Sequence, residues 1–330
     1  MKLANNRTIA IASGKGGVGK TIITANLALS LAQRYGSEAS IVAVDLDLGC
    51  GNLNSCLGVR SPNGTIDGFL TNKVSNLEQL LTPTGQSNLR MICSSYSGSP
   101  NTRLNEERKQ SLLQQLNRLR ANFTLIDLGA GTSEDVLDIF LSASEKIVVI
   151  TPESLSLHNA FVFIKSAILR FLWNELGRED FLNPVKSNLE KMIQDEEKLD
   201  LGLLIDRLKV WDRYAAYVLA GLIDDLKIKF IVNMYRGGAE KSQLLNFHDL
   251  LFRYLRIRNN LSYLGFVHFD NGVPASVQAI KPFLLTYPKN RAAKDLVQVA
   301  EHLAEEKELY NSPVLSFPRQ SWWPPTLLNR

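Results

Sequence analysis

Short runs of β-branched and other apolar residues alternate along the chain with longer segments whose apolar residues recur at helical spacing. The short runs predict strands at Thr8–Ser13, Ala39–Asp45, Leu89–Cys93, Phe123–Asp127, Lys146–Ile150, Lys227–Asn233 and Leu261–Val267. The longer segments predict helices at Ile22–Arg34, Glu106–Arg120, Ser154–Phe171, Lys241–Tyr254 and Arg291–Lys307. This alternation is typical of a mostly parallel sheet with helices on both faces. The predicted fold class is therefore α/β, a doubly wound domain.

One long segment, residues 172–226, breaks this alternation. It has no strand-like run and is rich in Glu, Lys, Asp and Leu. Its apolar residues recur at helical spacing, with interruptions expected near Gly177, Pro184 and Gly202. Because a helix and the next strand usually need only a few connecting residues, we predict a single discontinuous domain, residues 1–171 and 227–309, with a helical insertion at 172–226. Whether the insertion is a packed subdomain or a partner-binding element stays open.

The last segment, residues 310–330, is predicted to be an extended or flexible tail. Four prolines rule out a continuous helix there: Pro313, Pro318, Pro324 and Pro325. Trp322 and Trp323 lie in the same segment.

A glycine-rich motif lies between the first expected strand and the first expected helix. Residues 14–21 read Gly-Lys-Gly-Gly-Val-Gly-Lys-Thr, and this spacing is that of a phosphate-binding loop. Its glycines let successive backbone N–H groups face a phosphate, and the helix N-terminus adds favourable potential. Lys20 is expected to contact the β- and γ-phosphates, and the Thr21 hydroxyl to coordinate magnesium. The motif predicts a P-loop NTPase.

Three acidic residues lie where a magnesium nucleotide needs them. Asp45 and Asp47 end the second expected strand, and Asp127 ends another. Because parallel strands bring their carboxyl ends to one edge of the sheet, where ligands bind, these carboxylates should gather beside the phosphate-binding loop.

Composition leaves the partner open. Lys and Arg number 37 against 33 Asp and Glu, and a net charge of +4 is too small to predict a nucleic-acid or membrane partner. The cysteines, Cys50, Cys56 and Cys93, include no CxxC pair, so neither a disulfide framework nor an iron–sulfur cluster is expected. The start lacks the apolar core of a signal peptide. We expect a cytoplasmic protein, with peripheral contact at the inner face of the membrane left open.

The loop carries an additional lysine, Lys15, near its start, and other segments match motifs of the same family. Lys15–Thr21 resembles the deviant Walker A motif of the MinD/ParA family of P-loop ATPases. Further resemblances are Asp45–Leu53 to switch I, Asp127–Gly131 to switch II, Val232–Tyr235 to the strand whose Asn reads adenine, and Thr151–Leu155 and Leu264–Asp270, followed by Val277 and Pro282, to the MinD and flagellar-number regulator (FlhG/FleN) branch.

The resemblance implies an ATP-dependent sandwich dimer with ATP and Mg²⁺, and a role for each matched residue. Lys15 is expected to reach the phosphates of the partner subunit and, with Lys20, to stabilise phosphoryl transfer, while Asp47 orients the attacking water. Asp45 and Asp127 are expected to assist Thr21 at the magnesium, through water. The implied nucleotide-binding residues are Gly14, Lys15, Gly16, Gly17, Val18, Gly19, Lys20, Thr21, Ile22 and Asn233, the last at the adenine edge.

The sequence departs from the family pattern at Ile22, where Thr or Ser usually helps to bind the α-phosphate. The missing CxxC pair argues against the related nitrogenase iron protein and cluster-scaffold ATPases. The helix expected at Arg291–Lys307 has the spacing of a packed domain helix rather than of a basic amphipathic membrane helix.

We predict a MinD/ParA-type ATP hydrolase that dimerises with ATP, binds a protein partner and resets by hydrolysis, and so positions or counts a cellular structure: a division site, a flagellum or a cargo. One alternative is a DNA-binding partition ATPase, for which the candidate cations are Arg253, Arg256, Arg258, Lys289, Arg291 and Lys294. The other is a non-hydrolysing nucleotide-gated scaffold, in which Ile22 and the insertion have replaced turnover with partner binding.

Overall fold

The computed structural model describes residues 6–49, 51–94, 104–176, 186–187, 200–238, 240–255 and 261–306, with backbone only at Trp211. Its strands are β1 Arg7–Ala12, β2 Ile41–Leu46, β3 Thr82–Pro83, β4 Leu89–Ile92, β5 Phe123–Leu128, β6 Glu145–Ile150, β7 Ile228–Tyr235 and β8 Leu261–His268. All the expected strands are therefore present. The two-residue β3 was not predicted.

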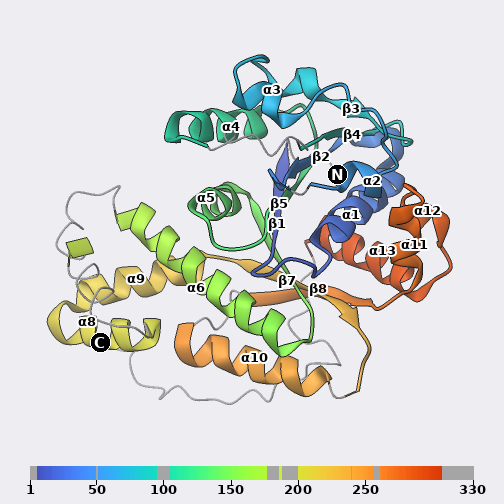
Figure 1. The fold of residues 1–330 in the computed structure, drawn as a ribbon. Helices are drawn as coiled ribbons and strands as arrows, with labels where there is room; N and C mark the ends of the chain where they lie inside the picture. The colour runs from blue at the N-terminus through green and yellow to red at the C-terminus, as the bar shows by residue number, and fades with distance from the viewer. Residues whose placement is uncertain are drawn as a thin grey trace.

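These strands form one sheet in the order β3-β4-β2-β5-β1-β6-β7-β8 (Figure 1). Every pairing is parallel except that of β3 with β4 at the edge. Every residue of β2 and β5 is buried, because strands covered on both faces need continuous apolar runs. The doubly wound, mostly parallel fold class is confirmed.

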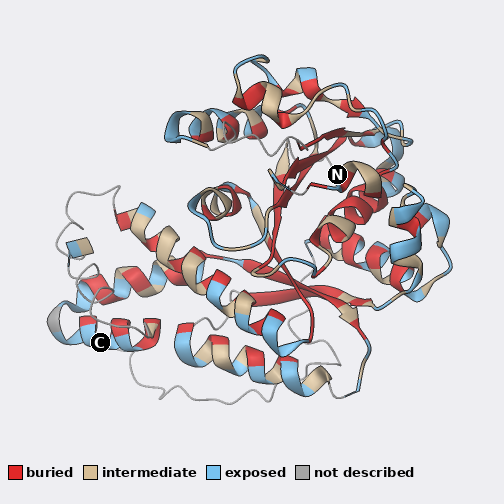
Figure 2. Ribbon diagram, viewed as in Figure 1, coloured by how far each residue is buried: buried red, intermediate tan, exposed pale blue. Residues whose placement is uncertain are grey.

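Helices cover both faces of the sheet. They are α1 Lys20–Tyr35, α2 Leu53–Cys56, α3 Ile66–Leu70, α4 Glu106–Arg118, α5 Glu134–Ser142, α6 Ser154–Leu176, α8 Leu201–Trp211, α9 Arg213–Asp225, α10 Glu240–Leu255, α11 Gly272–Gln278, α12 Phe283–Thr286 and α13 Arg291–Ala304. One core packs α1, α2, α12 and α13 on one face. The other packs α3 to α6 and α8 to α10 on the opposite face. Buried residues form the inward stripes of these helices (Figure 2).

Between residues 172 and 226 the chain is helical wherever the structure describes more than two consecutive residues. The helix expected to end at Phe171 continues to Leu176, and α8 and α9 follow. Asp200 and Asp212 cap these two helices, each accepting a backbone N–H, from Leu203 and Ala215 respectively. The interruption expected near Gly202 lies at Asp200, the extended N-cap of α8, and Gly202 itself is buried in the first turn of that helix. Gly177, Pro184 and the 310–330 tail lie outside the described residues.

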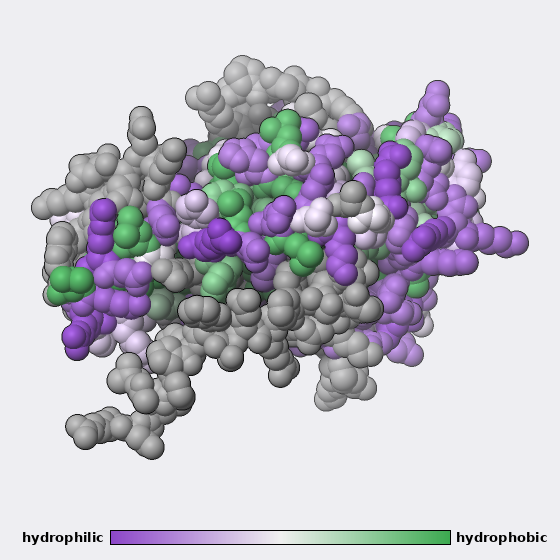
Figure 3. Space-filling model, turned by 90° about the horizontal axis from the view of Figure 1, so that it is seen from below, coloured by the Kyte–Doolittle hydropathy of each residue, from purple (hydrophilic) through white to green (hydrophobic). Residues whose placement is uncertain are grey.

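The helix α6 is apolar and 23 residues long, sufficient by length and composition to cross a membrane. In the structure 44% of its most apolar window is buried, against the sheet and neighbouring helices. The face seen in Figure 3, from the side of α8 and α10, has hydrophobic side chains separated by hydrophilic ones. Burial against the sheet and neighbouring helices therefore accounts for part of the apolar composition of α6.

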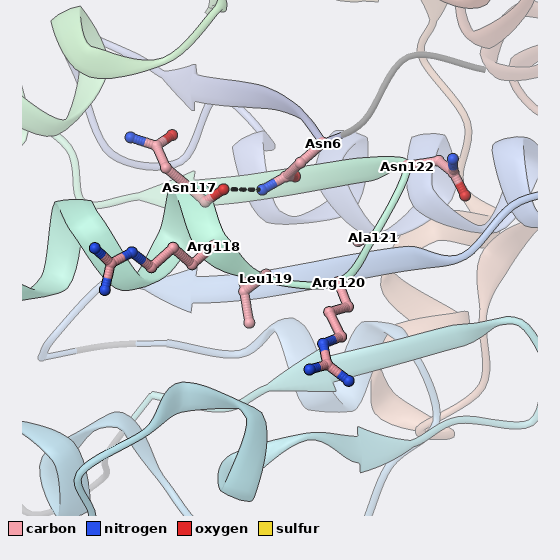
Figure 4. Close-up of a pocket in the computed structure, with 7 residues that line it drawn as sticks. All are labelled: Asn6, Asn117, Arg118, Leu119, Arg120, Ala121 and Asn122. Carbon is pink, nitrogen blue, oxygen red and sulfur yellow. Dashed lines mark hydrogen bonds between the residues drawn. The ribbon is translucent and has the colours of Figure 1, made fainter. Parts of the chain in front are cut away.

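The side chain of Asn6 joins the start of β1 to the end of α4 by hydrogen bonds. Its Nδ2 donates to the carbonyls of Leu116 (2.9 Å) and Asn117 (3.1 Å), and its Oδ1 accepts from the hydroxyl of Thr124 (2.7 Å). Beside it lies an open hollow of about 470 Å³ (Figure 4), lined by Asn6, Asn117, Arg118, Leu119, Arg120, Ala121 and Asn122. This hollow lies where β1 and β5 begin, at the edge opposite the phosphate-binding loop, and its lining includes no carboxylate.

Glu145 lies between two cations at the same edge. Its carboxylate is 2.8 Å from Arg7 Nη2 and 2.8 Å from Lys229 Nζ, and all three side chains are at least 85% buried. Arg7 also donates to the carbonyls of Leu303 and Ala304 at the end of α13. Burial alone would raise the pKa of Glu145, but hydrogen bonds and charge from Lys229 and Arg7 outweigh it and hold the pKa below its usual value.

Glu145→Gln is expected to lower the free energy of unfolding by about 3 kcal/mol at pH 7, because two buried cations lose their counter-charge. A carboxylate with a lowered folded-state pKa stabilises the fold above its unfolded pKa of about 4.3 and loses that effect as pH falls through the folded-state value. The difference between the variant and wild type should therefore vanish in acid. Urea unfolding checks it, with Glu78→Gln as control, since Arg120, the partner of Glu78, is 89% exposed. Equal losses in both variants would contradict the assignment.

Candidate functional site

The loop expected to bind phosphate joins β1 to α1 at the carboxyl edge of the sheet. Gly17 (φ 81°) and Gly19 (φ 89°) adopt left-handed backbone conformations that side chains rarely take. The following helix begins at Lys20 without a side-chain cap, so its first N–H groups remain available to an anion. Lys20 is buried and Lys15 is half-buried. The loop thus has the open helix N-terminus that a phosphate requires.

Gly14 fixes how close this loop lies to α6. A Cβ added at Gly14 would overlap the backbone of Asn159, in the second turn of α6. Only glycine permits this approach. The loop is therefore packed directly against the long core helix.

Asp45 and Asp127 meet at the same edge, because β2 pairs with β5 in a register that places them side by side. Asp45 accepts the backbone N–H groups of Asp47 and Leu53, each at 3.1 Å. Asp127 accepts from the hydroxyl of Thr24 (3.3 Å) and is also hydrogen-bonded to Thr21. Burial raises the pKa of Asp45 to about 6 and, with the charge of Asp45 adding to it, that of Asp127 to about 7.

These groups fit a magnesium ion bound together with phosphates. Asp127 Oδ2 is buried without a hydrogen-bond partner, and a divalent cation or its water would supply one. The described residues contain no group of three His, Cys, Asp or Glu side chains placed to hold a metal. Magnesium commonly takes one or two protein carboxylates and completes its shell with water and substrate phosphates. This protein offers Thr21 and Asp127 in that way.

Switch II lies against the loop. The N–H of Gly131 donates to the carbonyl of Ser13 (3.1 Å), and the Ser13 hydroxyl donates to the carbonyl of Lys15 (2.7 Å). Asp47 faces the same segment, since a Cβ added at Gly129 would lie 3.8 Å from Asp47 Oδ1. The structure therefore brings Lys15, Asp47 and Asp127 to one locality.

Asn233 lies beside a small apolar pocket of about 110 Å³ at the end of β7. Its Nδ2 donates to the carbonyl of Val18 (2.8 Å), inside the phosphate-binding loop. Ile22 lines the same pocket, so the residue that departs from the family pattern forms an apolar wall. The lining is Gly19, Ile22, Asn233, Met234, Val267, His268, Phe269, Asp270, Val273, Pro274, Ala292 and Leu296.

The sequence did not predict several contacts made by residues in and beside this pocket. The guanidinium of Arg236 stacks 3.9 Å from the ring centroid of Phe269, and His268 Nδ1 lies 2.7 Å from the Asp295 carboxylate of α13. Residues 264–270 were recognised only as a matching motif, and no local signal pairs Asp295 with His268. The His268–Asp295 contact depends on the packing of α13 against β8, and the Arg236–Phe269 contact depends on the pairing of β7 with β8.

The candidate DNA-binding cations do not form one surface. Arg253 is exposed on α10, which packs on one face of the sheet, whereas Arg291 and Lys294 belong to α13 on the other. Arg256 and Arg258 lie outside the described residues.

Sheet order, phosphate-binding loop and carboxylate edge together define a P-loop NTPase. A family model described as ParA, NUBPL iron-transfer P-loop NTPase, matches residues 4–166. The septum site-determining protein MinD of Synechocystis sp. is 33% identical over 218 residues, which cover 62% of this chain and 78% of that protein. The chain belongs to the MinD/ParA family of P-loop NTPases.

Other proteins similar to this chain belong to the same family. MinD of Helicobacter pylori is 39% identical over 157 residues, 46% of this chain and 55% of that protein, so the match spans only about half of that relative. Among solved structures, MinD from Pyrococcus horikoshii complexed with Mg-ADP superposes with a TM-score of 0.62 at 21% identity, covering 94% of this chain and 100% of that one. A ParA-family ATPase from Chlorobium tepidum gives 0.60 at 19%, covering 90% and 98%. At these identities the structures support the fold.

Proposed function

We propose that this protein is an ATP-dependent dimerising switch ATPase. The observation that carries the proposal is the meeting of the lysine-bearing loop with Asp45, Asp47 and Asp127, one of which keeps a buried oxygen without a partner. Two buried carboxylates with raised pKa values favour a site that is completed by a cation. Such a site suits phosphoryl transfer, in which positioning and charge stabilisation provide most of the catalysis.

Each residue of this site has a proposed role in nucleotide binding or in hydrolysis. Lys20 and the first N–H groups of α1 hold the phosphates. Thr21 and Asp127 would hold a magnesium ion, which would supply positive charge beside the phosphates. Asp47 orients the attacking water, and Lys15 adds positive charge across the dimer interface. The amide of Asn233 has its Nδ2 tied to Val18, so Oδ1 remains to accept from the amino group of adenine. Guanine presents a carbonyl oxygen there, and this favours ATP over GTP.

We further propose that this ATPase switch positions a cellular structure. The division site is the leading candidate for that structure. Support comes from relatives named as septum site-determining proteins and from an Aquifex aeolicus MinC:MinD complex of the same fold, TM-score 0.58 at 20% identity over 91% of this chain and 96% of that one. A protein partner, cytoplasmic location and membrane contact belong to this proposal. Phosphate release separates this proposal from the scaffold alternative, and salt-sensitive, ATP-dependent binding to nonspecific duplex DNA would identify the DNA-partition alternative. Roles in flagellar number or cargo positioning remain alternatives to the division site.

Lys15→Ala is expected to bind ATP as a monomer, whereas wild type dimerises with ATP. The physical reason is that Lys15 is proposed to supply the charge that holds the partner's phosphates, while Lys20 keeps nucleotide affinity within one subunit. Light scattering with ATP and Mg²⁺ measures the mass, and a fluorescent ATP analogue measures binding.

Lys73 is exposed and lies outside the phosphate-binding loop. The matched control, Lys73→Ala, should therefore dimerise with ATP as wild type does. A Lys15→Ala dimer that still forms only with ATP would remove the cross-subunit role of Lys15.

A further inference from the structure

Five exposed cations lie on or next to α2, α12 and α13, elements that Figure 1 shows on one side of the molecule with α11. They are Arg60, Lys281, Lys289, Arg291 and Lys294, and with Leu285 they are defined here as the basic surface. All five are exposed, and none has an ion pair within the part of the chain that the structure describes. Proximity follows from the chain itself, since four lie within residues 281–294 and Gly58, two residues before Arg60, packs on Pro282.

Several positive charges at a helix N-terminus are unfavourable unless an anionic group lies against them. The first turn of α13 holds no acidic residue, and the side chain of its N-cap, Asn290, makes no capping hydrogen bond to that turn. Lys289, Arg291 and Lys294 therefore crowd the positive end of the helix dipole, where anions are favoured. Two acids lie nearby, and both are engaged: Asp270 by the Asn290 amide and the Gly272 N–H, and Asp295 by His268.

The basic surface includes an apolar residue. Leu285, on α12 between Lys281 and Lys289, is 50% exposed. A nucleic-acid backbone offers this side chain little apolar contact, and membrane insertion requires a whole apolar face rather than one leucine. A peptide that carries carboxylates beside an apolar side chain satisfies both the cations and Leu285.

The basic surface is also connected to the nucleotide site by two routes. Asp45 accepts the N–H of Leu53, the first residue of α2, and α2 leads to Gly58, where an added Cβ would lie 3.3 Å from Pro282. Independently, Asn26 of α1 accepts the N–H of Leu284 (3.0 Å) and donates to the carbonyl of Ile22 (2.8 Å). Switch I and the helix that follows the phosphate-binding loop are therefore in contact with the segment that contains α12.

We infer that the basic surface docks an acidic segment of a partner protein that carries an apolar anchor for Leu285, and that it does so more tightly with ATP than with ADP. This inference rests on the proposed nucleotide switch for its ATP preference. The cations provide charge attraction, and Leu285 and its anchor bury apolar area. Because coupling is reciprocal, the bound segment raises ATP affinity by the same factor.

Fluorescence anisotropy tests the inference with a labelled synthetic peptide of glutamates and leucines at helical spacing. The full-length protein is loaded with a non-hydrolysable ATP analogue or with ADP. Lys289→Glu/Lys294→Glu should weaken binding about tenfold or more, and Leu285→Ser several-fold. The matched control, Lys73→Glu/Lys227→Glu, reverses two other exposed lysines and should bind like wild type apart from a small change in long-range attraction.

Three outcomes would overturn the inference: equal peptide affinity for wild type and the Lys289/Lys294 variant, equal affinity with both nucleotides, or binding of short duplex DNA or phosphatidylglycerol vesicles in place of the peptide. Phosphate release is measured separately, on the same protein variants supplied with ATP and without peptide, and should match wild type. Normal hydrolysis without peptide binding would refute the docking surface alone. Peptide binding gated by nucleotide without hydrolysis would instead refute the proposed ATPase.

Discussion

Asp47→Ala is expected to slow phosphate release from ATP by about 100-fold or more while ATP remains bound and the dimer persists. Asp47 follows β2, is half-buried, and faces Gly129 of switch II. Removing it takes away the group proposed to orient water but leaves the phosphate contacts of Lys20 and the helix N-terminus. Losses of this size are typical when a water-positioning or charge-stabilising group is removed from a phosphoryl-transfer site.

Single-turnover phosphate release and light scattering on the same sample check this expectation. Asp224→Ala, at an exposed position in α9, serves as the control and should hydrolyse ATP at the wild-type rate. If wild type itself releases phosphate no faster than Asp47→Ala, the protein is a nucleotide-gated scaffold and the hydrolase proposal fails.

Asp127→Asn is expected to stabilise the nucleotide-free protein and to remove its response to Mg-ATP. Burial raises the pKa of Asp127 to about 7. A raised folded-state pKa means that stability is full below the unfolded value of about 3.9 and is lost as pH rises through the folded value. At pH 8 wild type therefore carries the whole cost of an ionised, buried carboxylate, roughly 2–4 kcal/mol, and Asn does not.

Thermal unfolding without nucleotide should show the variant several degrees more stable at pH 8, with a smaller difference at pH 5. With Mg-ATP the difference at pH 8 should shrink, because ligand at about 100 times its Kd stabilises wild type by about 2.7 kcal/mol, whereas the variant lacks the carboxylate proposed to hold magnesium. Asp224→Asn should show neither effect. A variant less stable than wild type at pH 8 without nucleotide would mean that Asp127 contributes more through its hydrogen bonds than it costs by its charge.

The sheet and the phosphate-binding loop could be predicted because their signals are local. Buried parallel strands need continuous apolar runs, so β2 and β5 were visible as such, and their register then placed Asp45 beside Asp127. The phosphate-binding loop could be recognised from the spacing of its glycines. The expected gathering of carboxylates needed only the rule that parallel strands share one carboxyl edge.

The remaining features depend on contacts between distant residues. The short α5 had a readable signal, since Ser133 caps it through the Val136 N–H and two acids fill its first turn, but nine residues were too few for periodicity. The strand β3 exists only because β4 pairs with it. The amide of Asn233 is oriented by Val18, 215 residues earlier, and no sequence pattern records that contact. Domain boundaries and individual site roles stay predictions.

The order of strands has a consequence for how the protein is made. In the sheet β5 separates β1 from β2, although more than 75 residues separate the end of β2 from the start of β5 in the chain. On the ribosome, β2 can pair with β4, which emerges before β5, but β1 has no sheet neighbour until β5 emerges, and long-range pairing of this kind is slow. Asp127 arrives on that same strand. A nascent chain therefore lacks the carboxylate proposed to hold magnesium until β5 joins β1 and β2, and we expect it to bind no Mg-ATP before that point.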